Sequence, residues 1–339
     1  MNNYLFNFAA SHTGGGYKRL YEYSKWFNEN RGACFIINIK SSNLIDEFKN
    51  NKYFTVHENL FQRVFNDCAY LKTIINEIGK PKFYYSYGIP IYNKIAEINW
   101  FHLNNVLPLV PYKIPMSFYY RLKFIYLGSK IRNGFKYSDI ISAESNSSLG
   151  LINSKYNSKL FLSVNGSNEE IDYFNSGIIH KKEDIALVIG TYWYKALKDA
   201  FSIYKMLSKK ESKLKLVIIG NDKTIPLNIR KNNNVEIINK FLDRIEFISY
   251  LRKCKYYISA TLIENSSNAN SEGIFFAEES FISDIGPHRE LLKNIDFEYV
   301  SIPNINRPII HLVRKNINGS NLKSWNDIIL EIINRMHSN

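Results

Sequence analysis

Short apolar runs alternate with longer amphipathic segments along the chain, and this alternation occurs in two consecutive rounds. In the first round the apolar runs predict strands at 4–10, 33–39, 52–57, 82–88, 98–103 and 140–145. In the second round they predict strands at 158–164, 184–190, 214–221, 234–240, 255–261 and 280–285. Helical periodicity lies between them, for example at 17–30, 61–79, 196–210 and 244–254. Because such alternation is typical of parallel sheets covered by helices, the sequence predicts an α/β fold with two doubly wound, Rossmann-like domains.

The length of 339 residues fits two domains of about 150 residues each. We expect an N-terminal domain over 1–160 and a C-terminal domain over 161–318. The remaining segment, 319–339, begins with a Gly-Ser break and continues as an amphipathic helix that could pack back toward the N-terminal domain. Ligands of open parallel sheets bind beyond the carboxyl ends of the strands, and two such sheets facing each other would form a cleft.

The net charge of +13 favours an anionic partner, which could be a nucleic acid, a membrane surface or a phosphorylated substrate. Cys34, Cys68 and Cys254 are odd in number and far apart, so we expect free thiols in a reducing cytoplasm. No Cys/His cluster has metal-ligand spacing. No apolar stretch approaches the ~20 residues that cross a bilayer, and the N-terminus has no signal-peptide pattern.

Basic and aromatic side chains are interleaved over 113–137, a stretch without any acid. Such a helical segment suits the headgroup layer of an anionic membrane. The alternative is an amphipathic helix whose aromatic side chains face the core and whose basic side chains face water. The basic residues of the stretch are Lys113, Arg121, Lys123, Lys130, Arg132 and Lys136.

Three features of possible chemical importance follow predicted strands. Gly14, Gly15 and Gly16 come before a helix, where backbone N–H groups can approach an anion. His102 ends another strand and is either structural or part of a site. Gly190 ends a third strand, and Lys195 after it could neutralise a diphosphate. The alternative for Lys195 is a solvated lysine in the first turn of a helix.

Two glutamates flank a loop rich in Asn and Ser. Glu264 lies at the end of a predicted strand, and Glu272 lies close to the start of a helix. Carboxylates accept hydrogen bonds from sugar hydroxyls, and the start of a helix favours a phosphate. One glutamate could therefore hold a hexose and the other a ribose. Taken alone, the pair could instead stabilise a helix dipole.

The order of these parts resembles the retaining GT-B glycosyltransferases of glycosyltransferase family 4, in particular those of bacterial surface-polysaccharide synthesis. That family has two glutamates separated by seven residues, then a helix, a short strand and Ser-Asp, which here is Ser283-Asp284. Asn165-Gly166 resembles the family's domain junction, and 189–200 resembles its strand–Gly…Lys–helix segment. The resemblance spans nearly the whole chain and is specific in its second half. It implies the GT-B fold.

The resemblance also implies roles for individual residues. Glu264 would bind hydroxyls of the donor sugar and act with His102 at the sugar ring, while Glu272 would bind the ribose. Lys195 would bind the diphosphate, helped by Gly190, by the glycines at 14–16 and by backbone N–H groups of the loop. The loop residues assigned to donor binding are Asn265, Ser266, Ser267, Asn268 and Ala269.

This chain departs from the family at several places, and two of them concern the donor site. The family's Gly-Phe-Gly-Leu-Pro is replaced by the sequence at 265–269, and Thr191 stands where an arginine often binds the diphosphate. Either Lys195 carries more of the charge or another basic residue compensates. The implied reaction is sugar transfer with retention of configuration, by positioning the substrates and stabilising the departing diphosphate. No cofactor or metal is expected, and no Asp-x-Asp motif of metal-dependent enzymes is present.

The expected substrates are a UDP-, GDP- or dTDP-sugar and a lipid-linked glycan of O-antigen, capsule or lipopolysaccharide synthesis. We expect the enzyme on the cytoplasmic face of the membrane, held there by 113–137. A sugar-nucleotide epimerase of the same architecture is an alternative, and it would turn over donor without an acceptor. A nucleic-acid-binding protein would explain the charge, but no recognised motif accompanies it. A dinucleotide oxidoreductase is disfavoured because its glycine fingerprint is missing.

Overall fold

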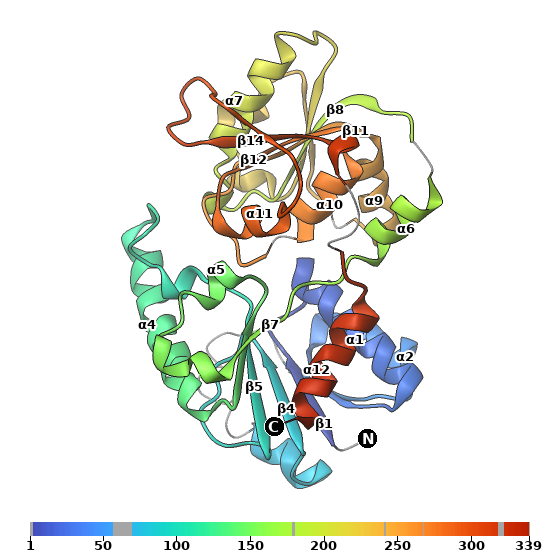
Figure 1. The fold of residues 1–339 in the computed structure, drawn as a ribbon, viewed down its shortest axis with the longest axis vertical. Helices are drawn as coiled ribbons and strands as arrows, with labels where there is room; N and C mark the ends of the chain where they lie inside the picture. The colour runs from blue at the N-terminus through green and yellow to red at the C-terminus, as the bar shows by residue number, and fades with distance from the viewer. Residues whose placement is uncertain are drawn as a thin grey trace. The chain divides into compact units, whose positions relative to one another are not determined.

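The computed structural model describes residues 3–56, 70–177, 180–240, 242–266, 268–317 and 322–338 (Figure 1). The chain forms two compact units, which we call the N-terminal unit and the C-terminal unit. The N-terminal unit contains Met1–Gly166 together with Trp325–Asn339, and the C-terminal unit contains Ser167–Ser324. Cys68, Ser267 and the predicted Gly-Ser break at 319–320 lie outside the described residues.

The N-terminal unit is built on a seven-stranded parallel sheet of order β3-β2-β1-β4-β5-β6-β7. Its strands are β1 (Tyr4–Phe8), β2 (Cys34–Asn38), β3 (Lys52–Val56), β4 (Phe83–Tyr87), β5 (Ile98–Leu103), β6 (Ile140–Ala143) and β7 (Leu160–Leu162). The central strands β1, β2 and β4 are buried along their whole length, as their uninterrupted apolar sequences require of a sheet covered on both faces.

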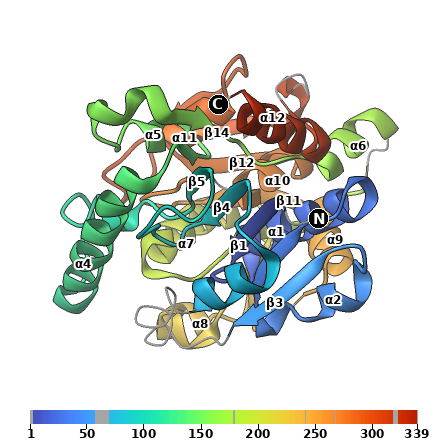
Figure 2. The ribbon, with the colours of Figure 1, turned by 90° about the horizontal axis from the view of Figure 1, so that it is seen from below.

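The helices of this unit are α1 (Gly14–Asn30), α2 (Asn43–Glu47), α4 (Phe118–Gly134), α5 (Asn146–Leu149) and α12 (Trp325–His337). Residues 70–78 are also helical, and they form the end of the helix that we predict over 61–79. Helices α1 and α12 lie side by side in Figures 1 and 2 and share one apolar core with β1, β2 and β4. The C-terminal helix therefore completes the N-terminal unit.

The placement of the segment 158–164 in the second round of alternation is wrong. Strand β7 pairs in parallel with β6, with Ile141 opposite Leu160 and Ala143 opposite Leu162, so it extends the N-terminal sheet. The reason is that a parallel edge strand has the same apolar pattern in either sheet. Its own sequence does not show which strand it pairs with.

The C-terminal unit contains a second seven-stranded sheet, of order β10-β9-β8-β11-β12-β14-β13. Its strands are β8 (Glu183–Ile189), β9 (Lys215–Ile219), β10 (Val235–Ile238), β11 (Cys254–Ser259), β12 (Glu279–Ser283), β13 (Glu298–Val300) and β14 (Ile309–Val313). Strand β14 runs antiparallel to both β12 and β13, and the other pairs are parallel. The sequence reading did not predict this antiparallel edge.

Helices cover both faces of the second sheet. They are α6 (Asn168–Ser176), α7 (Leu197–Ser208), α8 (Leu227–Arg230), α9 (Arg244–Lys253), α10 (Asn268–Phe276) and α11 (Gly286–Leu291). Helix α7 packs into the core on one face, whereas α6, α9 and α10 pack into the core on the other. Gly273 allows α10 to lie close to β11, because a Cβ atom there would be 2.4 Å from the ring of Tyr257.

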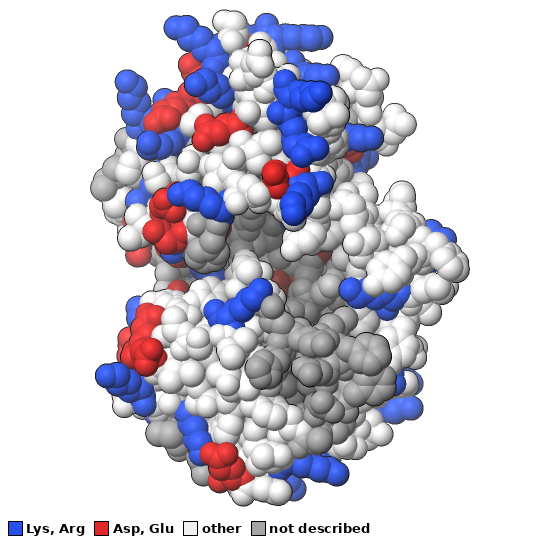
Figure 3. All heavy atoms as spheres, turned by 180° about the vertical axis from the view of Figure 1, so that it is seen from behind, with Lys and Arg blue, Asp and Glu red and all other residues white. Residues whose placement is uncertain are grey.

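Helix α4 exposes large apolar side chains. Phe118 and Tyr119 are 75% and 70% exposed, and Leu122 and Tyr126 are about half-exposed. Over the described part of the chain, no helix is both long enough and apolar enough to span a bilayer. Figure 3 shows Lys and Arg side chains scattered over one face of the protein, with Asp and Glu side chains among them.

Candidate functional site

In the C-terminal unit, the turn after β8 holds Lys195 at the carboxyl end of the sheet. Gly190 has φ +85°, a conformation that favours glycine, and the chain then forms a short 3-10 helix, Trp193–Lys195. The backbone carbonyl of Tyr194 accepts hydrogen bonds from Leu262 N (2.8 Å) and Thr261 Oγ1 (3.3 Å). These bonds tie the turn after β8 to the loop after β11.

Lys195 and Glu264 meet at this edge of the sheet. Lys195 Nζ forms a close ion pair with Glu264 Oε1, and the two side chains are only 15% and 12% exposed. Partial burial makes such a pair stronger than a surface ion pair, because water screens it less. Two residues that the sequence analysis assigned to different parts of a nucleotide sugar therefore touch each other here.

The loop between Glu264 and Glu272 is mostly helix. Helix α10 begins at Asn268, so Asn268 and Ala269 lie in its first turn and Glu272 lies within it. Asn265 is buried, and Ser266 is half-buried. The first N–H groups of a helix have no intrahelical acceptor, so this end of α10 can bind an anion.

Glu272 is nearly buried and is paired with an arginine. Its side chain is 3% exposed, and Oε1 accepts a hydrogen bond from Arg244 Nη2 at 2.7 Å. Arg244 Nε donates to Glu169 Oε1 at 2.8 Å. Burial alone would lower the pKa of Arg244, but the two carboxylates outweigh it and raise that pKa. The guanidinium therefore keeps its charge and fixes the position of the Glu272 side chain.

Both glutamates lie near Tyr257 on the strand below them. Burial raises the pKa of the Tyr257 hydroxyl, and the charges of Glu264 and Glu272 raise it further. The hydroxyl donates to Asn270 Oδ1 at 2.6 Å, which fixes the first turns of α10 against β11. The structure thus brings the two predicted glutamates to the same region of the unit.

Thr191, at the position of the missing arginine, is engaged locally. It is buried, it packs against Gly220, and its Oγ1 accepts from Thr224 Oγ1 at 2.7 Å. Nearby, a hollow of about 510 Å³ opens at the carboxyl ends of β9 and β10. Its lining includes Asn221, Asp222, Lys223, Asn239 and Lys240.

In the N-terminal unit, Gly14, Gly15 and Gly16 form the first turn of α1. Gly14 has φ +60°, and a Cβ atom on Gly16 would lie 3.0 Å from Ser11 Oγ and 3.3 Å from the ring of Tyr87. Gly16 therefore lets the start of α1 approach the end of β4 closely. Their predicted contact with a donor stays a prediction.

His102 is fully buried at the end of β5. Its imidazole stacks on the ring of Tyr87 at a centroid distance of 4.9 Å, and its Nδ1 is 2.8 Å from Ser142 Oγ. Burial, and after it the charge of Arg19, lower its pKa to about 4. The imidazole is therefore neutral at physiological pH. The predicted role of His102 at the ring of a donor sugar stays a prediction.

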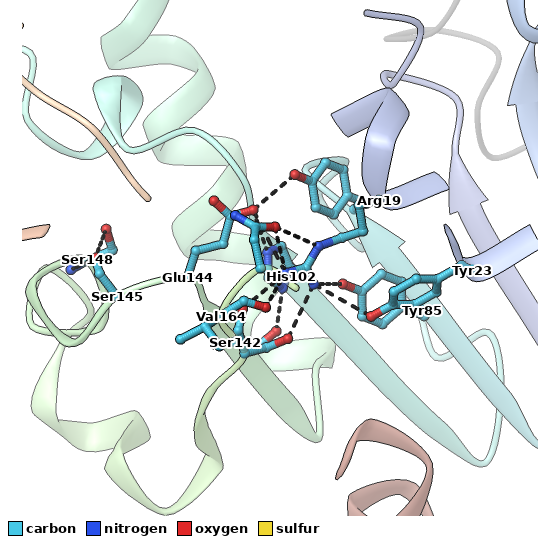
Figure 4. A network of polar contacts seen from close by, with 12 residues as sticks. Arg19, Tyr23, Tyr85, His102, Ser142, Glu144, Ser145, Ser148 and Val164 are labelled. Carbon is cyan, nitrogen blue, oxygen red and sulfur yellow. Dashed lines mark hydrogen bonds and ion pairs between the residues drawn. The ribbon is translucent and has the colours of Figure 1, made fainter. Parts of the chain in front are cut away.

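The imidazole belongs to a polar network that also contains Arg19 and Glu144 (Figure 4). Glu144 follows β6 directly, and its Oε1 lies 3.1 Å from Tyr87 Oη, 3.5 Å from His102 Nε2 and 4.0 Å from Arg19 Nη2. Burial favours the neutral acid, but His102 and Arg19 outweigh it and lower the pKa of Glu144. Glu144 is therefore an ionised carboxylate at the carboxyl end of this sheet.

Arg244, Glu144 and Arg19 were not predicted from the sequence. Arg244 is the first residue of α9, where a positive charge opposes the helix dipole, so its position was an available signal for a carboxylate partner. Glu144 follows an apolar strand just as His102 does, and the same rule could have found it. In the described part of the chain, no group of three or more His, Cys, Asp or Glu side chains is arranged to hold a metal ion.

No protein-family model matches the sequence, and no curated protein sequence matches it. Solved structures do match most of the chain. WaaG, a glycosyltransferase involved in lipopolysaccharide biosynthesis, superimposes with a TM-score of 0.62 at 11% identity, over 86% of this chain and 84% of WaaG. The chain has the GT-B fold.

Two other GT-B structures are similar to it. The UDP-forming α,α-trehalose-phosphate synthase from Burkholderia xenovorans, in complex with glucose-6-phosphate, gives a TM-score of 0.55 at 9% identity, over 85% of this chain and 86% of that chain. The UDP-GlcNAc 2-epimerase from Neisseria meningitidis, bound to UDP-GlcNAc, gives 0.51 at 12% identity, over 86% and 84%. The prediction of two doubly wound domains with this fold is confirmed.

Proposed function

We propose that this GT-B protein is a glycosyltransferase that moves a sugar from a nucleotide-sugar donor to a lipid-linked glycan in surface-polysaccharide synthesis. The Lys195–Glu264 ion pair beside the start of α10 is the observation that carries the proposal. A nucleotide sugar carries an anionic diphosphate and a set of hydroxyl donors. Lysine and glutamate side chains complement these two groups, and such a ligand can replace the contact that they make with each other.

Each part of the nucleotide sugar is then assigned to particular residues. Lys195 and the first N–H groups of α10 bind the diphosphate, with Gly190 and the glycines at 14–16 as further backbone contacts. Glu264 accepts hydrogen bonds from the transferred sugar, beside His102 at the ring. Glu272, held by Arg244, accepts from the ribose. The loop contacts come from Asn265, Ser266, Ser267, Asn268 and Ala269, and Ser267 lies outside the described residues.

We propose retention of configuration without a metal, with Glu264 and His102 as the catalytic residues. In this reaction the protein orients the two substrates and stabilises the diphosphate that departs. Lys195 supplies the positive charge, since Thr191 at the position of the usual arginine supplies none. The similarity to WaaG is one support for a glycan of lipopolysaccharide, O-antigen or capsule as the acceptor.

Helix α4 is the proposed contact with the membrane. Its exposed Phe118 and Tyr119 lie among basic residues such as Arg121 and Lys123, and no acid interrupts them. Aromatic side chains partition into the headgroup layer, and lysine and arginine are attracted to anionic lipids. This contact would bring the enzyme to a lipid-linked acceptor at the cytoplasmic face of the membrane.

A sugar-nucleotide epimerase is the second candidate, because an epimerase bound to UDP-GlcNAc is among the structural neighbours. An epimerase converts a nucleotide sugar with no second substrate. Release of a nucleoside diphosphate only when an acceptor is present supports the transferase. Conversion of the nucleotide sugar with no acceptor supports the epimerase.

The test is thermal-shift and calorimetric screening against UDP-, GDP- and dTDP-sugars, since a ligand of the folded state raises its stability. Lys195→Ala and Glu272→Ala should each weaken donor affinity by about 10- to 100-fold, because a hydrogen bond to a charged group contributes roughly 1.5–3 kcal/mol. The matched controls are Lys198→Ala and Glu278→Ala, which change exposed residues of the same types. Unchanged donor affinity in both site variants, in folded protein, contradicts the site assignment.

A further inference from the structure

Glu144 is an ionised carboxylate that the donor contacts proposed above do not use. It lies at the carboxyl end of the sheet of the N-terminal unit, in the residue that follows β6. Its side chain is 6% exposed and is held by residues from β4 and β5 (Figure 4). A carboxylate that neighbouring residues hold in one position can bind a hydrogen-bond donor of a ligand.

The hydrogen atoms around His102 can be assigned from their donors. The Trp100 indole N–H can only donate, and it lies 2.6 Å from Ser142 Oγ, so this hydroxyl accepts that bond. Ser142 Oγ lies 2.8 Å from His102 Nδ1 and has its own hydrogen to donate to that nitrogen. The proton of the neutral imidazole is therefore on Nε2, which faces Glu144 Oε1. The opposite tautomer would direct a lone pair at a carboxylate.

The network therefore orients Glu144 but supplies no proton to it. The pKa of His102 is lowered to about 4 and the pKa of Glu144 is lowered too, so the imidazole is neutral and the acid is charged at physiological pH. A carboxylate of lowered pKa is a weak base. It is, however, a strong hydrogen-bond acceptor, and binding is the role that suits it.

A purely structural role for Glu144, as the counter-ion of Arg19, leaves part of the geometry unexplained. Arg19 is fully buried, yet its donors are directed elsewhere, to Asn165 Oδ1, Ser163 Oγ, the carbonyl oxygens of Ser163 and Val164, and the hydroxyls of Tyr23 and Tyr85. Its distance of 4.0 Å to Glu144 is the longest of these contacts. Arg19 is thus satisfied without using the hydrogen-bonding capacity of Glu144.

Glu144 also keeps capacity for a ligand. A carboxylate offers about four lone pairs. Tyr87 and His102 approach Oε1, and the amide of Asn165 contributes one further hydrogen bond. At least one acceptor position is left, and the carboxylate itself is 6% exposed. A hydroxyl of a sugar is a donor that fits such a charged acceptor.

We propose that Glu144 binds the acceptor glycan, accepting a hydrogen bond from a hydroxyl of its terminal sugar, and that Trp100, Ser142 and His102 are positioning residues for this carboxylate. The inference rests on the transferase function proposed above. The hydroxyl that Glu144 binds is a neighbour of the one that attacks, so Glu144 takes up no proton in the transfer. It contributes to the choice of acceptor and to its orientation.

The test uses soluble methyl glycosides of glucose, galactose, mannose and N-acetylglucosamine, with UDP, GDP or dTDP present. The carboxyl signal of Glu144 is followed by NMR in protein labelled with carbon-13 glutamate. At least one glycoside should shift this signal in the wild type, and Glu144→Gln should weaken that glycoside's binding at least tenfold. Glu97→Gln is the matched control, since Glu97 is exposed just before β5, at the opposite edge of the sheet.

The proposed nucleotide-sugar site and the proposed acceptor contact of Glu144 can be tested independently. Glu144→Gln should leave nucleotide-sugar affinity within about twofold, whereas Lys195→Ala should lose nucleotide-sugar affinity and keep glycoside binding. A nitrogen-15 spectrum should show neutral His102 with its proton on Nε2, and Glu144→Gln should change this spectrum. Glycoside binding that is unaffected by Glu144→Gln, a Glu144 signal that no glycoside moves, or a proton on Nδ1 of His102 overturns the inference.

Discussion

His288 is buried in a position that accepts only a neutral imidazole with its proton on Nδ1. Nδ1 donates to the carbonyl oxygen of Ser283 at 2.6 Å, and Nε2 accepts from Nδ2 of Asn270, whose Oδ1 accepts from Tyr257. Burial lowers the pKa of His288 to about 4. A proton on Nε2 would face the Asn270 amide hydrogens, so acid removes a contact that holds α10, the helix of Glu272.

We therefore predict that acid destabilises the C-terminal unit through His288. The unfolded chain binds a proton near pH 6.5, whereas the folded unit binds it only near pH 4. Stability is thus present above pH 6.5 and is lost as pH falls toward 4, by about 2 kcal/mol between about pH 7 and about pH 5. Urea denaturation, followed separately for each unit, measures this loss.

His288→Gln provides the comparison for this prediction. The variant should be less stable at neutral pH, and the acid-dependent loss in its C-terminal unit should shrink by about 2 kcal/mol. The N-terminal unit contains His102, with a similarly lowered pKa, and should keep its acid sensitivity in the same sample. An equal pH dependence in the variant and the wild type contradicts the role of His288.

Residues that belong to a recognisable spacing were easier to predict than residues that are marked only by distant partners. Glu264 and Glu272 were found from their spacing, and the structure brings both near Tyr257. The position of Glu144 after an apolar strand could have been noticed, but its partners come from other strands and from α1, and no local pattern records those contacts. Arg244 was missed because an arginine at the start of a helix reads as an exposed charge.

Helix α4 carries large aromatic side chains that do not pack against the rest of its unit. Its buried residues, Phe124, Gly128, Ile131 and Gly134, form one narrow stripe, and Gly128 packs against the carbonyl of Pro108. The aromatic residues at its start do not contribute to that stripe. The interpretation with all aromatic side chains facing the core is therefore wrong for Phe118 and Tyr119.

We predict that Phe118→Ser combined with Tyr119→Ser weakens binding to vesicles that contain anionic lipid by about 10-fold or more, because exposed apolar area contributes roughly 25 cal/mol per Å² on transfer. Co-sedimentation with such vesicles measures the effect. The control is Tyr299→Ser, which removes an aromatic side chain that is 58% exposed in the other unit. Equal loss in the control, or no binding by the wild type, contradicts the membrane role of α4.

Strands, like single residues, were hard to predict where their place depends on partners that are distant in sequence. Buried parallel strands such as β1 and β2 were predicted because their apolar runs are long and bounded by turns. Strand β7 has three residues, and its partner β6 could not be read from its own sequence. Strand β14 follows Pro308 and runs antiparallel, whereas the repeating pattern led us to expect only parallel strands.

At the scale of the whole molecule, the N-terminal unit is made of two separate pieces of chain. The chain leaves this unit after Gly166 and returns to it at Trp325. These two residues touch, since a Cβ atom on Gly166 would lie 2.5 Å from Cγ of Trp325. The last helix buries Trp325, Ile328, Ile329, Ile332, Ile333 and Met336 against α1 and the sheet.

A chain that ends at Ser324 should therefore lose the fold of the N-terminal unit. Each buried side chain of α12 contributes about 1.5–3 kcal/mol, and their sum is comparable to the 5–15 kcal/mol that stabilises a typical domain. Limited proteolysis should degrade 1–166 and spare 167–324. A chain that ends at His337 is the control and should resist as the full chain does. Wild-type resistance of the shorter chain would show that α12 is dispensable.

The return of the chain at Trp325 has a consequence for biosynthesis. A ribosome makes the first piece of the N-terminal unit before the C-terminal unit, but it makes the helix that closes the core of the N-terminal unit after the C-terminal unit. The C-terminal unit can fold as soon as it emerges. Until α12 is made, the apolar face of α1 and its neighbouring strands that α12 covers stays exposed. Of the two units, the one translated first is thus the one completed last, and during that interval it is the part of the nascent chain most in need of a chaperone.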